Sequence, residues 1–157
     1  MFRDAISLDL NLDLRKVTSP ISPHNQRDNS GKFYFCSNTN YCCHINKILP
    51  LEPVLQEFDI WITGVRADQN SNRKTMKEIM DGPFGIERYH PMLHWNSKEV
   101  WEYRQKHKLP SHPLEEQGYL SIGCAPCTSS VFDDERNGRW KGKGKDECGL
   151  HIELVKK

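Results

Sequence analysis

The stretch Asp59-Ile60-Trp61-Ile62-Thr63-Gly64-Val65 decides the fold class of this chain. A short apolar run bounded by polar residues is typical of a buried β-strand. The apolar spacing in residues 50–57 predicts a helix before this strand, with Pro50 in its first turn, and a polar helix is expected to follow the strand through Ile79. Helices that alternate with strands favour an α/β fold with a mostly parallel sheet.

Weaker patterns predict further elements along the rest of the chain. They indicate the end of a helix at residues 2–7 and a strand at residues 11–17. They also indicate a short helix with two cysteines at residues 40–47 and a capped helix at residues 97–107. Asn96 and Glu99 resemble a capping box for the last helix because they lie three residues apart at its start. Residues 18–33 and those after Pro113 are expected to be loops, apart from short turns near the second cysteine pair.

The composition is that of an ordinary globular domain. At 157 residues, with 36% hydrophobic and 27% charged residues, the chain is long enough for one domain with a buried core. Its net charge of +1 gives no general affinity for nucleic acid, and it has no apolar run that could span a bilayer. Residues 1–5 lack the apolar core of a secretory signal, so we expect a cytoplasmic protein whose thiols stay reduced.

Four of the six cysteines form two tight pairs, Cys42 with Cys43 and Cys124 with Cys127. In a reducing compartment, clustered cysteines more often bind metal than form disulfides. A [4Fe–4S] cluster fits adjacent ligands better than zinc does, because neighbouring side chains diverge and can reach two different irons. An interaction module built on a four-cysteine zinc site, and buried pairs without metal, stay open as alternatives. Cys36 has no partner at ligand spacing and is predicted to be structural.

Cys148 is a lone thiol close to the C-terminus, and residues 141–157 are predicted to form a mobile, glycine-containing tail. The three lysines before Cys148, together with His151, favour the thiolate, which is the form in which cysteine acts as a nucleophile. Asp146 and Glu147 oppose them, so both a nucleophile and an idle exposed thiol are consistent with these residues.

None of the ten glycines lies in a phosphate-binding loop. The chain has no Ser-Gly-Gly, no G-x-G-x-x-G and no Walker A motif. Such a loop is expected to follow the first strand of this kind of fold. We therefore expect the first two strands and the loop to belong upstream of residue 11, which would make the chain an N-terminally truncated single domain with an incomplete sheet.

Five segments occur in a fixed order along the chain. They are Cys42-Cys43-x-x-x-Lys47-x-x-Pro50-Leu51; Trp61-Ile62-Thr63-Gly64-x-Arg66-x-Asp68-Gln69, followed by Arg73; Gly118-Tyr119-x-Ser121-Ile122-Gly123-Cys124-Ala125-Pro126-Cys127-Thr128; Glu135-Arg136-x-Gly138-Arg139-Trp140; and Glu147-Cys148-Gly149-Leu150-His151. In this order and with these gaps, the segments resemble the assimilatory sulfonucleotide reductases, specifically the iron–sulfur enzymes called adenylyl-sulfate (APS) reductases.

The resemblance implies a sulfonucleotide reductase domain with a Rossmann-like sheet of the adenine-nucleotide α-hydrolase type. It implies that Cys42, Cys43, Cys124 and Cys127 hold a [4Fe–4S] cluster. It also implies that Cys148 attacks the sulfur of APS, which leaves an S-sulfocysteine and releases AMP. A thioredoxin or glutaredoxin would then release sulfite, in sulfate assimilation and cysteine biosynthesis.

The resemblance further implies that five residues bind the substrate: Lys47, Arg66, Arg136, Arg139 and His151. Two alternatives remain at this point. The chain could reduce the 3′-phosphorylated substrate (PAPS), or it could be an inactive cluster-binding fragment or partner subunit that needs an N-terminal half from another chain. We expect no nucleic-acid partner and no membrane partner.

Overall fold

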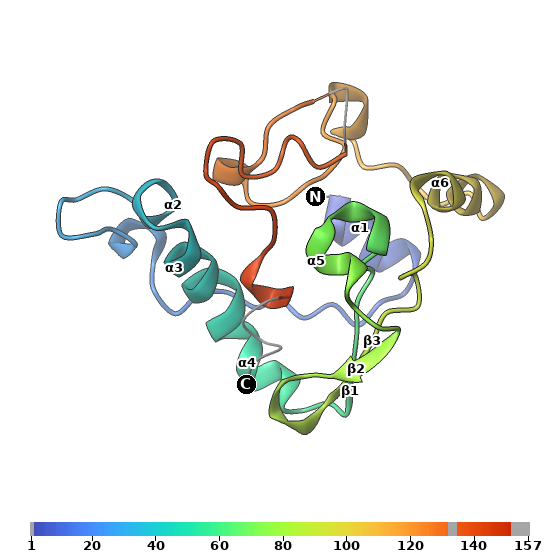
Figure 1. Ribbon diagram of the computed structural model, residues 1–157, viewed down its shortest axis with the longest axis horizontal. Helices are drawn as coiled ribbons and strands as arrows, with labels where there is room; N and C mark the ends of the chain where they lie inside the picture. Colours follow the sequence, from blue (N-terminus) through green and yellow to red (C-terminus); the bar gives the residue numbers. More distant parts are fainter. Residues whose placement is uncertain (1, 132–134, 152–157) are drawn as a thin grey trace. The chain divides into compact units, whose positions relative to one another are not determined.

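The computed structural model describes residues 2–131 and 135–151 as an α/β structure (Figure 1). The described residues belong to two compact units. Unit 1 is built from residues 2–16 and 95–142, and unit 2 is built from residues 17–94 and the C-terminal segment that begins at 143. The predicted tail at 141–157 lies within the described residues only as far as His151.

The helices and strands of the described residues are short, and β1, β2 and β3 all lie in unit 2. Unit 1 contains α1 (Phe2–Asp9), α6 (Ser97–Lys106) and the 3₁₀ turns η5 (Glu115–Gln117) and η6 (Ala125–Cys127). Unit 2 contains η1 (Pro23–Asn25), α2 (Tyr34–Ser37), α3 (Thr39–Cys43), η2 (His44–Ile48), α4 (Leu49–Leu55), β1 (Ile60–Ile62), η3 (Ala67–Gln69), α5 (Ser71–Lys74), β2 (Ile79–Asp81), η4 (Pro83–Gly85), β3 (Glu87–Tyr89) and η7 (Gly149–His151).

Unit 2 is organised around a three-stranded mixed sheet in the order β1-β3-β2. Strand β1 runs parallel to β3, whereas β2 runs antiparallel to β3. A short connection can join only antiparallel strands, and η4 makes this connection with Phe84 and Gly85 at positive φ angles of 60° and 77°. The α/β class is therefore confirmed, and the mostly parallel sheet is confirmed only in part.

The strand predicted from residues 59–65 is present as β1 (Ile60–Ile62), but the prediction that it is buried is wrong for two of its three side chains. Ile60 and Ile62 are 51% and 64% exposed. Successive side chains of a strand point to opposite faces of the sheet, so only Trp61 between them turns toward the core. Strand β1 also lies at one end of the sheet and has no strand on its outer side among the described residues.

The two helices predicted around the first cysteine pair are confirmed as one uninterrupted helical run from α3 to α4. Between them, η2 is a π-helical turn in which the Leu49 N–H bonds to the His44 carbonyl. Pro50 lies in the first turn of α4 and has no N–H to donate to the preceding turn, so a wider turn just before it costs little. This run places Cys43 and Lys47 on the side that faces the C-terminal segment.

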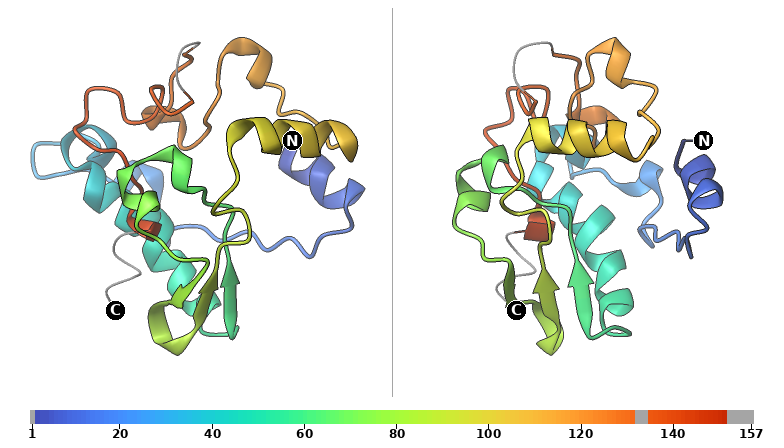
Figure 2. Two further views of the ribbon diagram at one scale, coloured as in Figure 1. Left: turned by 45° about the vertical axis from the view of Figure 1, so that its right-hand side comes forward. Right: turned by 90° about the vertical axis from the view of Figure 1, so that its right-hand side faces the viewer.

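The core of unit 2 lies between this helical run and the sheet, and α4 packs alongside β1 (Figure 2). Its buried centre consists of Ile48, Leu55 and Ile86, with Leu51, Trp61 and Leu150 packed against it. Leu150 belongs to η7, so the last described turn of the chain is part of this core. The core thereby fixes the neighbourhood of Cys148.

Two sequence-based elements are wrong. Residues 11–17 form no strand, and Leu12 and Leu14 are exposed, because within the described residues this segment has no strand to pair with. The polar helix expected through Ile79 ends at Lys74, and Ile79 begins β2 instead. In unit 1, the capped helix is confirmed as α6.

The capping box of α6 is formed as expected. Asn96 Oδ1 accepts the Glu99 N–H at 3.0 Å, and Glu99 Oε2 accepts the Asn96 N–H at 2.7 Å. The helix end predicted at residues 2–7 is also present, as α1.

Candidate active site

Cys148 is buried in unit 2, where residues 143–151 pack against the helical run. The residue is 7% exposed, and Lys47 Nζ donates a hydrogen bond to its Sγ at 3.4 Å. The Cys43 side chain, one turn before Lys47, also hydrogen-bonds to Cys148. Residues about a hundred positions apart in the sequence therefore meet at one thiol.

These contacts favour the thiolate at Cys148. The hydrogen bond from Cys43 lowers the pKa of Cys148 most, burial opposes the shift, and the positive charge of Lys47 adds to the lowering. The same hydrogen bond and burial raise the pKa of Cys43, which remains the protonated donor. Because the thiolate is the nucleophilic form of cysteine, the surroundings of Cys148 suit a nucleophile better than an idle thiol.

The lysines of the segment before Cys148 make other contacts. Lys143 Nζ donates to the Phe35 carbonyl at 2.8 Å, and Lys145 Nζ donates to Asn40 Oδ1 at 2.7 Å. They attach the segment to α2 and α3. The lysine that contacts the Cys148 thiol is Lys47, one of the predicted substrate-binding residues.

Glu147 is completely buried immediately before Cys148 and forms an ion pair with Arg73. Arg73 Nε donates to Oε2 at 2.5 Å and Nη2 donates to Oε1 at 3.0 Å, while Asn70 Nδ2 donates to Oε2 at 3.0 Å. Oε1 also accepts the backbone N–H of Cys148 at 2.8 Å. Burial alone would raise the pKa of Glu147, but these hydrogen bonds and the charge of Arg73 outweigh it and lower the pKa to about 2.

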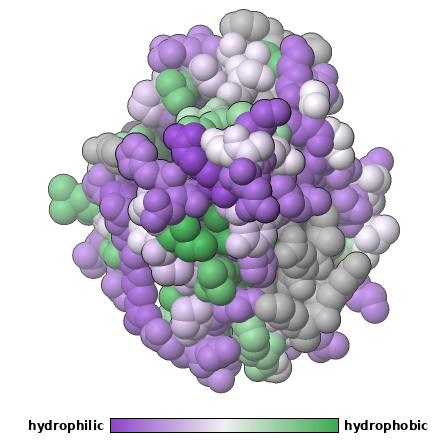
Figure 3. Space-filling model, turned by 90° about the vertical axis from the view of Figure 1, so that its left-hand side faces the viewer, coloured by the Kyte–Doolittle hydropathy of each residue, from purple (hydrophilic) through white to green (hydrophobic). Residues whose placement is uncertain are grey.

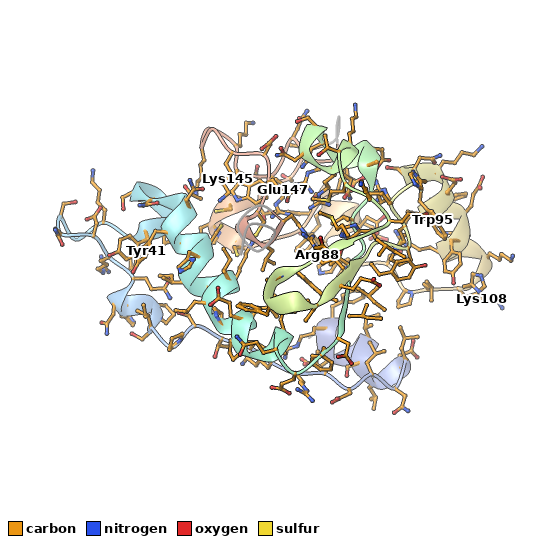
Figure 4. The ribbon with its side chains drawn as sticks, turned by 60° about the horizontal axis from the view of Figure 1, so that its bottom comes forward. Tyr41, Arg88, Trp95, Lys108, Lys145 and Glu147 are labelled. Atoms are coloured by element: carbon orange, nitrogen blue, oxygen red, sulfur yellow. The ribbon has the colours of Figure 1, made fainter. Side chains whose placement is uncertain are left out.

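His151 follows Cys148 in the sequence and lies against the side of the sheet to which Trp61 points. Its ring stacks on Trp61 at a centroid distance of 6.2 Å, and Arg88 Nη2 lies 3.0 Å from its Nδ1. Burial lowers the pKa of His151 to about 4, so the ring is neutral at neutral pH and Nδ1 accepts from Arg88. Figure 4 shows Arg88 and Glu147 in the interior of unit 2, with Lys145 further toward α3.

Arg88 is fully buried, and its Nε and Nη1 atoms have no hydrogen-bond partner among the described residues. Burial lowers the pKa of this guanidinium. Arg66, one of the predicted substrate-binding residues, is also buried and forms an ion pair with Asp68 at 3.0 Å in η3.

The other two predicted arginines lie in unit 1, around the second cysteine pair. The Arg139 guanidinium stacks over the Trp140 ring at 4.4 Å and donates to the Ile122 carbonyl at 3.0 Å. The Arg136 guanidinium lies 5.7 Å from the centre of the same ring. Both cations are thus gathered at one aromatic side chain, and Arg139 borders the loop that carries Cys124.

The four predicted metal ligands are divided between the units, with Cys42 and Cys43 in unit 2 and Cys124 and Cys127 in unit 1. Cys42 Sγ accepts from Asn46 Nδ2 at 3.6 Å, whereas the neighbouring Cys43 turns toward Cys148. This divergence agrees with the argument that two adjacent cysteines suit two different irons. Within residues 2–131 and 135–151, no three Cys, His, Asp or Glu side chains are grouped closely enough to hold a metal ion.

None of the six cysteines, all of which lie within the described residues, forms a disulfide, so four thiols of the kind that a cluster needs are present. Cys36 is exposed, and the expectation that it packs as a structural residue is wrong. It lies at the surface of the four-residue helix α2, where no core covers it.

Arg73, Glu147 and Arg88 were absent from the predicted site. Arg73 and Glu147 stood in the quoted motifs, and Asn70 three residues before Arg73 signals the helix N-cap that orients both side chains. A carboxylate next to a reactive cysteine could have suggested a buried partner cation. Nothing in the local sequence singles out Arg88, because its burial depends on long-range packing.

A polar pocket of about 470 Å³ lies between α2–α3 and the C-terminal segment of unit 2. Glu147 and Gly149, the neighbours of Cys148, line it together with Ser37, Asn40 and Lys145. Viewed from the α2 side, the surface is mainly hydrophilic, with a small hydrophobic group near the centre of the view (Figure 3). The residues on either side of Cys148 therefore border a polar hollow, and Cys148 itself is not among the residues that line it.

Comparisons with known proteins show what the chain is similar to. The sequence profile of the phosphoadenosine phosphosulfate reductase domain matches residues 1–130. A protein of Bacillus cytotoxicus named adenosine 5′-phosphosulfate reductase is 46% identical over 129 residues, which are 80% of this chain and 55% of that protein. A protein of Salinibacter ruber with the same name is 39% identical over 153 residues, which are 94% of this chain and 60% of that protein.

A crystal structure of phosphoadenylyl-sulfate (PAPS) reductase from Candida auris, in a phosphate complex, shares the fold. It superposes with a TM-score of 0.64 over 82% of this chain and 63% of that chain, at 21% sequence identity. The chain spans a little over half the length of the two bacterial relatives. Among the described residues, no helix is both long enough and apolar enough to cross a membrane.

The match to the family profile covers most of the chain, residues 1–130 of 157. The chain therefore belongs to the phosphoadenosine phosphosulfate reductase domain family.

Proposed function

We propose that the two units act as one reductase domain that uses Cys148 to reduce adenylyl sulfate to sulfite and AMP. The observation that carries this proposal is the placement of the Cys148 Sγ within hydrogen-bonding distance of Lys47 Nζ, in a buried position that favours the thiolate. The names of the bacterial relatives support APS as the substrate.

In the first step, the Cys148 thiolate forms a bond to the sulfur of the sulfate group of APS. The bond between that sulfur and the bridging oxygen breaks, its electron pair stays on the oxygen, and AMP leaves. Cys148 then carries a sulfonate group as S-sulfocysteine. Lys47 would stabilise negative charge on both the thiolate and the sulfonate, since an ammonium group acts as a point charge on either.

In the second step, a dithiol protein of the thioredoxin or glutaredoxin class supplies two electrons. One of its thiolates attacks Cys148 Sγ, and sulfite leaves with the electron pair of the sulfur–sulfur bond. The second thiol of the donor resolves the mixed disulfide, which returns Cys148 to its reduced form and leaves the donor as a disulfide.

The remaining predicted residues receive supporting roles in the proposal. Arg136 and Arg139 would hold the anionic part of the substrate, because guanidinium groups pair with phosphate and sulfate through two hydrogen bonds. Arg66 and His151 would shape the site from within unit 2, where both are engaged by protein partners.

Cys42, Cys43, Cys124 and Cys127 would hold a [4Fe–4S] cluster, as four reduced thiols that can each take one iron. When bound, the cluster would organise the site and tune its charge. Cys43 would then use its sulfur for iron, and Lys47 would remain as the described donor to Cys148.

The test is sulfite release from APS with a dithiol reductant, measured on a fusion of this chain to the upstream part of the Bacillus cytotoxicus relative. Cys148→Ser should abolish sulfite release, and Cys36→Ser, at the exposed thiol, should leave it unchanged. Normal turnover by Cys148→Ser would refute the assignment of the nucleophile.

The same assay separates the alternatives. Turnover of PAPS and not of APS would identify a reductase of the phosphorylated substrate. Iron and sulfide in the protein without any turnover would identify a cluster-binding partner subunit. Because no phosphate loop occurs in its sequence, the 157-residue chain alone should be a weak reductase that gains activity when the upstream part is supplied.

A further inference from the structure

The buried ion pair between Arg73 and Glu147 lies one residue before Cys148. We propose that this pair is a latch that positions Cys148 and controls access to its sulfur. The role of Cys148 as nucleophile rests on the proposed function, whereas the latch itself is argued from the contacts of unit 2.

The Glu147 carboxylate connects α5 to the backbone of Cys148. One oxygen accepts from Arg73 Nη2 and from the Cys148 N–H, at 3.0 and 2.8 Å, and the other accepts from Arg73 Nε and Asn70 Nδ2, at 2.5 and 3.0 Å. Arg73 is itself held by Gln69 of η3, whose Oε1 accepts from Nη1. The direction in which the Cys148 side chain leaves the backbone is thereby tied to a cation on another element.

A second attachment follows Cys148. The His151 N–H bonds to the Cys148 carbonyl at 3.0 Å, and the His151 ring is held by Arg88 and Trp61. Cys148 thus lies between two attached residues, Glu147 and His151. The attachment at His151 is reinforced by its neighbour Leu150, which packs against the core. The Glu147 attachment consists of polar contacts. A substitution that removes the charge but keeps the size of the side chain can therefore open this attachment without disturbing the packing of the core.

The latch matters because Cys148 is buried. At 7% exposure, its sulfur can react with a bulky thiol reagent, or with a cysteine of another protein, only after the segment moves away from the helical run. Removing one partner of a buried ion pair leaves the other charge uncompensated, which favours the conformation in which that charge meets water. Loss of either partner should therefore shift the segment toward an open state.

The test compares alkylation rates of two thiols in the same 157-residue chain. Cys36, which is exposed, serves as the internal reference, and the rates at Cys148 and Cys36 are followed by peptide mass spectrometry with iodoacetamide and with a maleimide that carries a polyethylene glycol chain. Glu147→Gln should raise the ratio of the Cys148 rate to the Cys36 rate about tenfold or more, and the gain should be larger for the bulky reagent.

The size dependence separates opening from charge. Removing a negative charge beside a thiol increases its reactivity toward both reagents alike, since a lower thiol pKa does not depend on reagent size. Asp146→Asn is the matched control, because it removes the same charge from the adjacent, exposed position. In this control, the ratio of the Cys148 rate to the Cys36 rate should change by the same factor for the small and the bulky reagent.

A double-variant comparison tests whether Arg73 and Glu147 act as one device. Arg73→Gln should reproduce the effect of Glu147→Gln, and the double variant should show the effect of one substitution and not the sum of both. Arg73→Lys keeps the charge but loses the paired geometry, so it should give an intermediate ratio and serves if the Gln variants fold poorly.

Equal gains for the small and bulky reagents in Glu147→Gln, or additive effects of the two substitutions, would overturn the proposal. Thermal unfolding and far-ultraviolet circular dichroism of each variant show whether unit 2 stays folded during the measurement. No substrate is involved, so a failure of the latch and a failure of Cys148 as nucleophile give different results.

Discussion

The two cysteine regions of this chain are built in different ways. Around Cys148, the contacts come from Lys47, Cys43 and Arg73, far away in the sequence, and most of them involve charged or ionisable side chains. Around Cys124 and Cys127, the contacts are mostly local and use the backbone.

In that second region, the Cys127 N–H bonds to the Cys124 carbonyl at 2.9 Å, and the hydroxyl of Thr128 donates to the same carbonyl at 3.0 Å. The Trp140 N–H closes the loop on the Cys127 carbonyl at 2.9 Å. The difference indicates that the contacts of the first region act on the reactivity of a thiol, whereas those of the second fix the backbone of the proposed ligand pair.

Serine substitutions should separate the two regions most strongly. If the proposed cluster is present, Cys124→Ser or Cys127→Ser should remove it, because each of the four irons needs its own thiolate, and anaerobically purified protein should lose iron and acid-labile sulfide together. Cys148→Ser should keep both, since the proposed ligands are unchanged. Stoichiometric zinc without sulfide in the unsubstituted protein would favour the four-cysteine zinc site over the cluster.

The Glu147 carboxylate should make the first region sensitive to acid. Its pKa is lowered to about 2 from an ordinary value of 4.5, so its stabilising effect is complete above pH 4.5 and is lost as the pH falls from 4.5 toward 2. A shift of this size corresponds to about 3 kcal/mol of unfolding free energy.

Urea unfolding of the wild type and of Glu147→Gln at pH 7 and pH 3 should show this. The difference between the two proteins should shrink as the pH falls, because the variant has no carboxylate to protonate. A difference that stays constant with pH would show that the ion pair contributes no pH-dependent stability. Asp146→Asn replaces the exposed neighbour, and its difference in unfolding free energy from the wild type should change much less between pH 7 and pH 3.

The second region should respond instead to backbone crowding. A methyl group at Gly138 would lie 2.2 Å from the Ser129 carbonyl oxygen, which is part of the loop backbone, so Gly138→Ala should lower the unfolding free energy by about 1–3 kcal/mol. At Gly123 the nearest atoms belong to the end of the Arg139 side chain, which can turn away. Gly123→Ala should therefore cost less stability and serves as the control in thermal unfolding.

This contrast also explains what the sequence could predict. The Asn96 cap of α6, the first turn of α4 at Pro50 and the turns near the second cysteine pair depend on neighbouring residues, and all are found as expected. Strand β3 and the hairpin with β2 were missed because Arg88, at the centre of β3, reads as a surface charge. Its burial becomes visible only when His151 and Trp61 are brought to it by the fold.

The candidate site divides in the same way. Cys148 and Lys47 were singled out by their motifs, and the structure brings them together. The pair between Arg73 and Glu147 joins residues 74 positions apart, and no periodic pattern or local spacing indicates such a pairing. Charged residues usually lie at the surface, so a sequence pattern does not predict which of them tertiary packing will bury.

The smallest expected effect concerns Lys47, and its sign is opposite to that of the latch. Lys47→Met removes the cation that lies 3.4 Å from Cys148 Sγ, so the thiolate becomes less favoured and alkylation of Cys148 by iodoacetamide at pH 7 should slow about tenfold or less. Lys47→Arg keeps the charge and should retain most of the rate. Cys36 again provides the reference thiol in the same sample. An increase in the Cys148 rate in Lys47→Met would mean that Lys47 acts mainly by closing the segment over the thiol, like Glu147, and not by stabilising negative charge on sulfur.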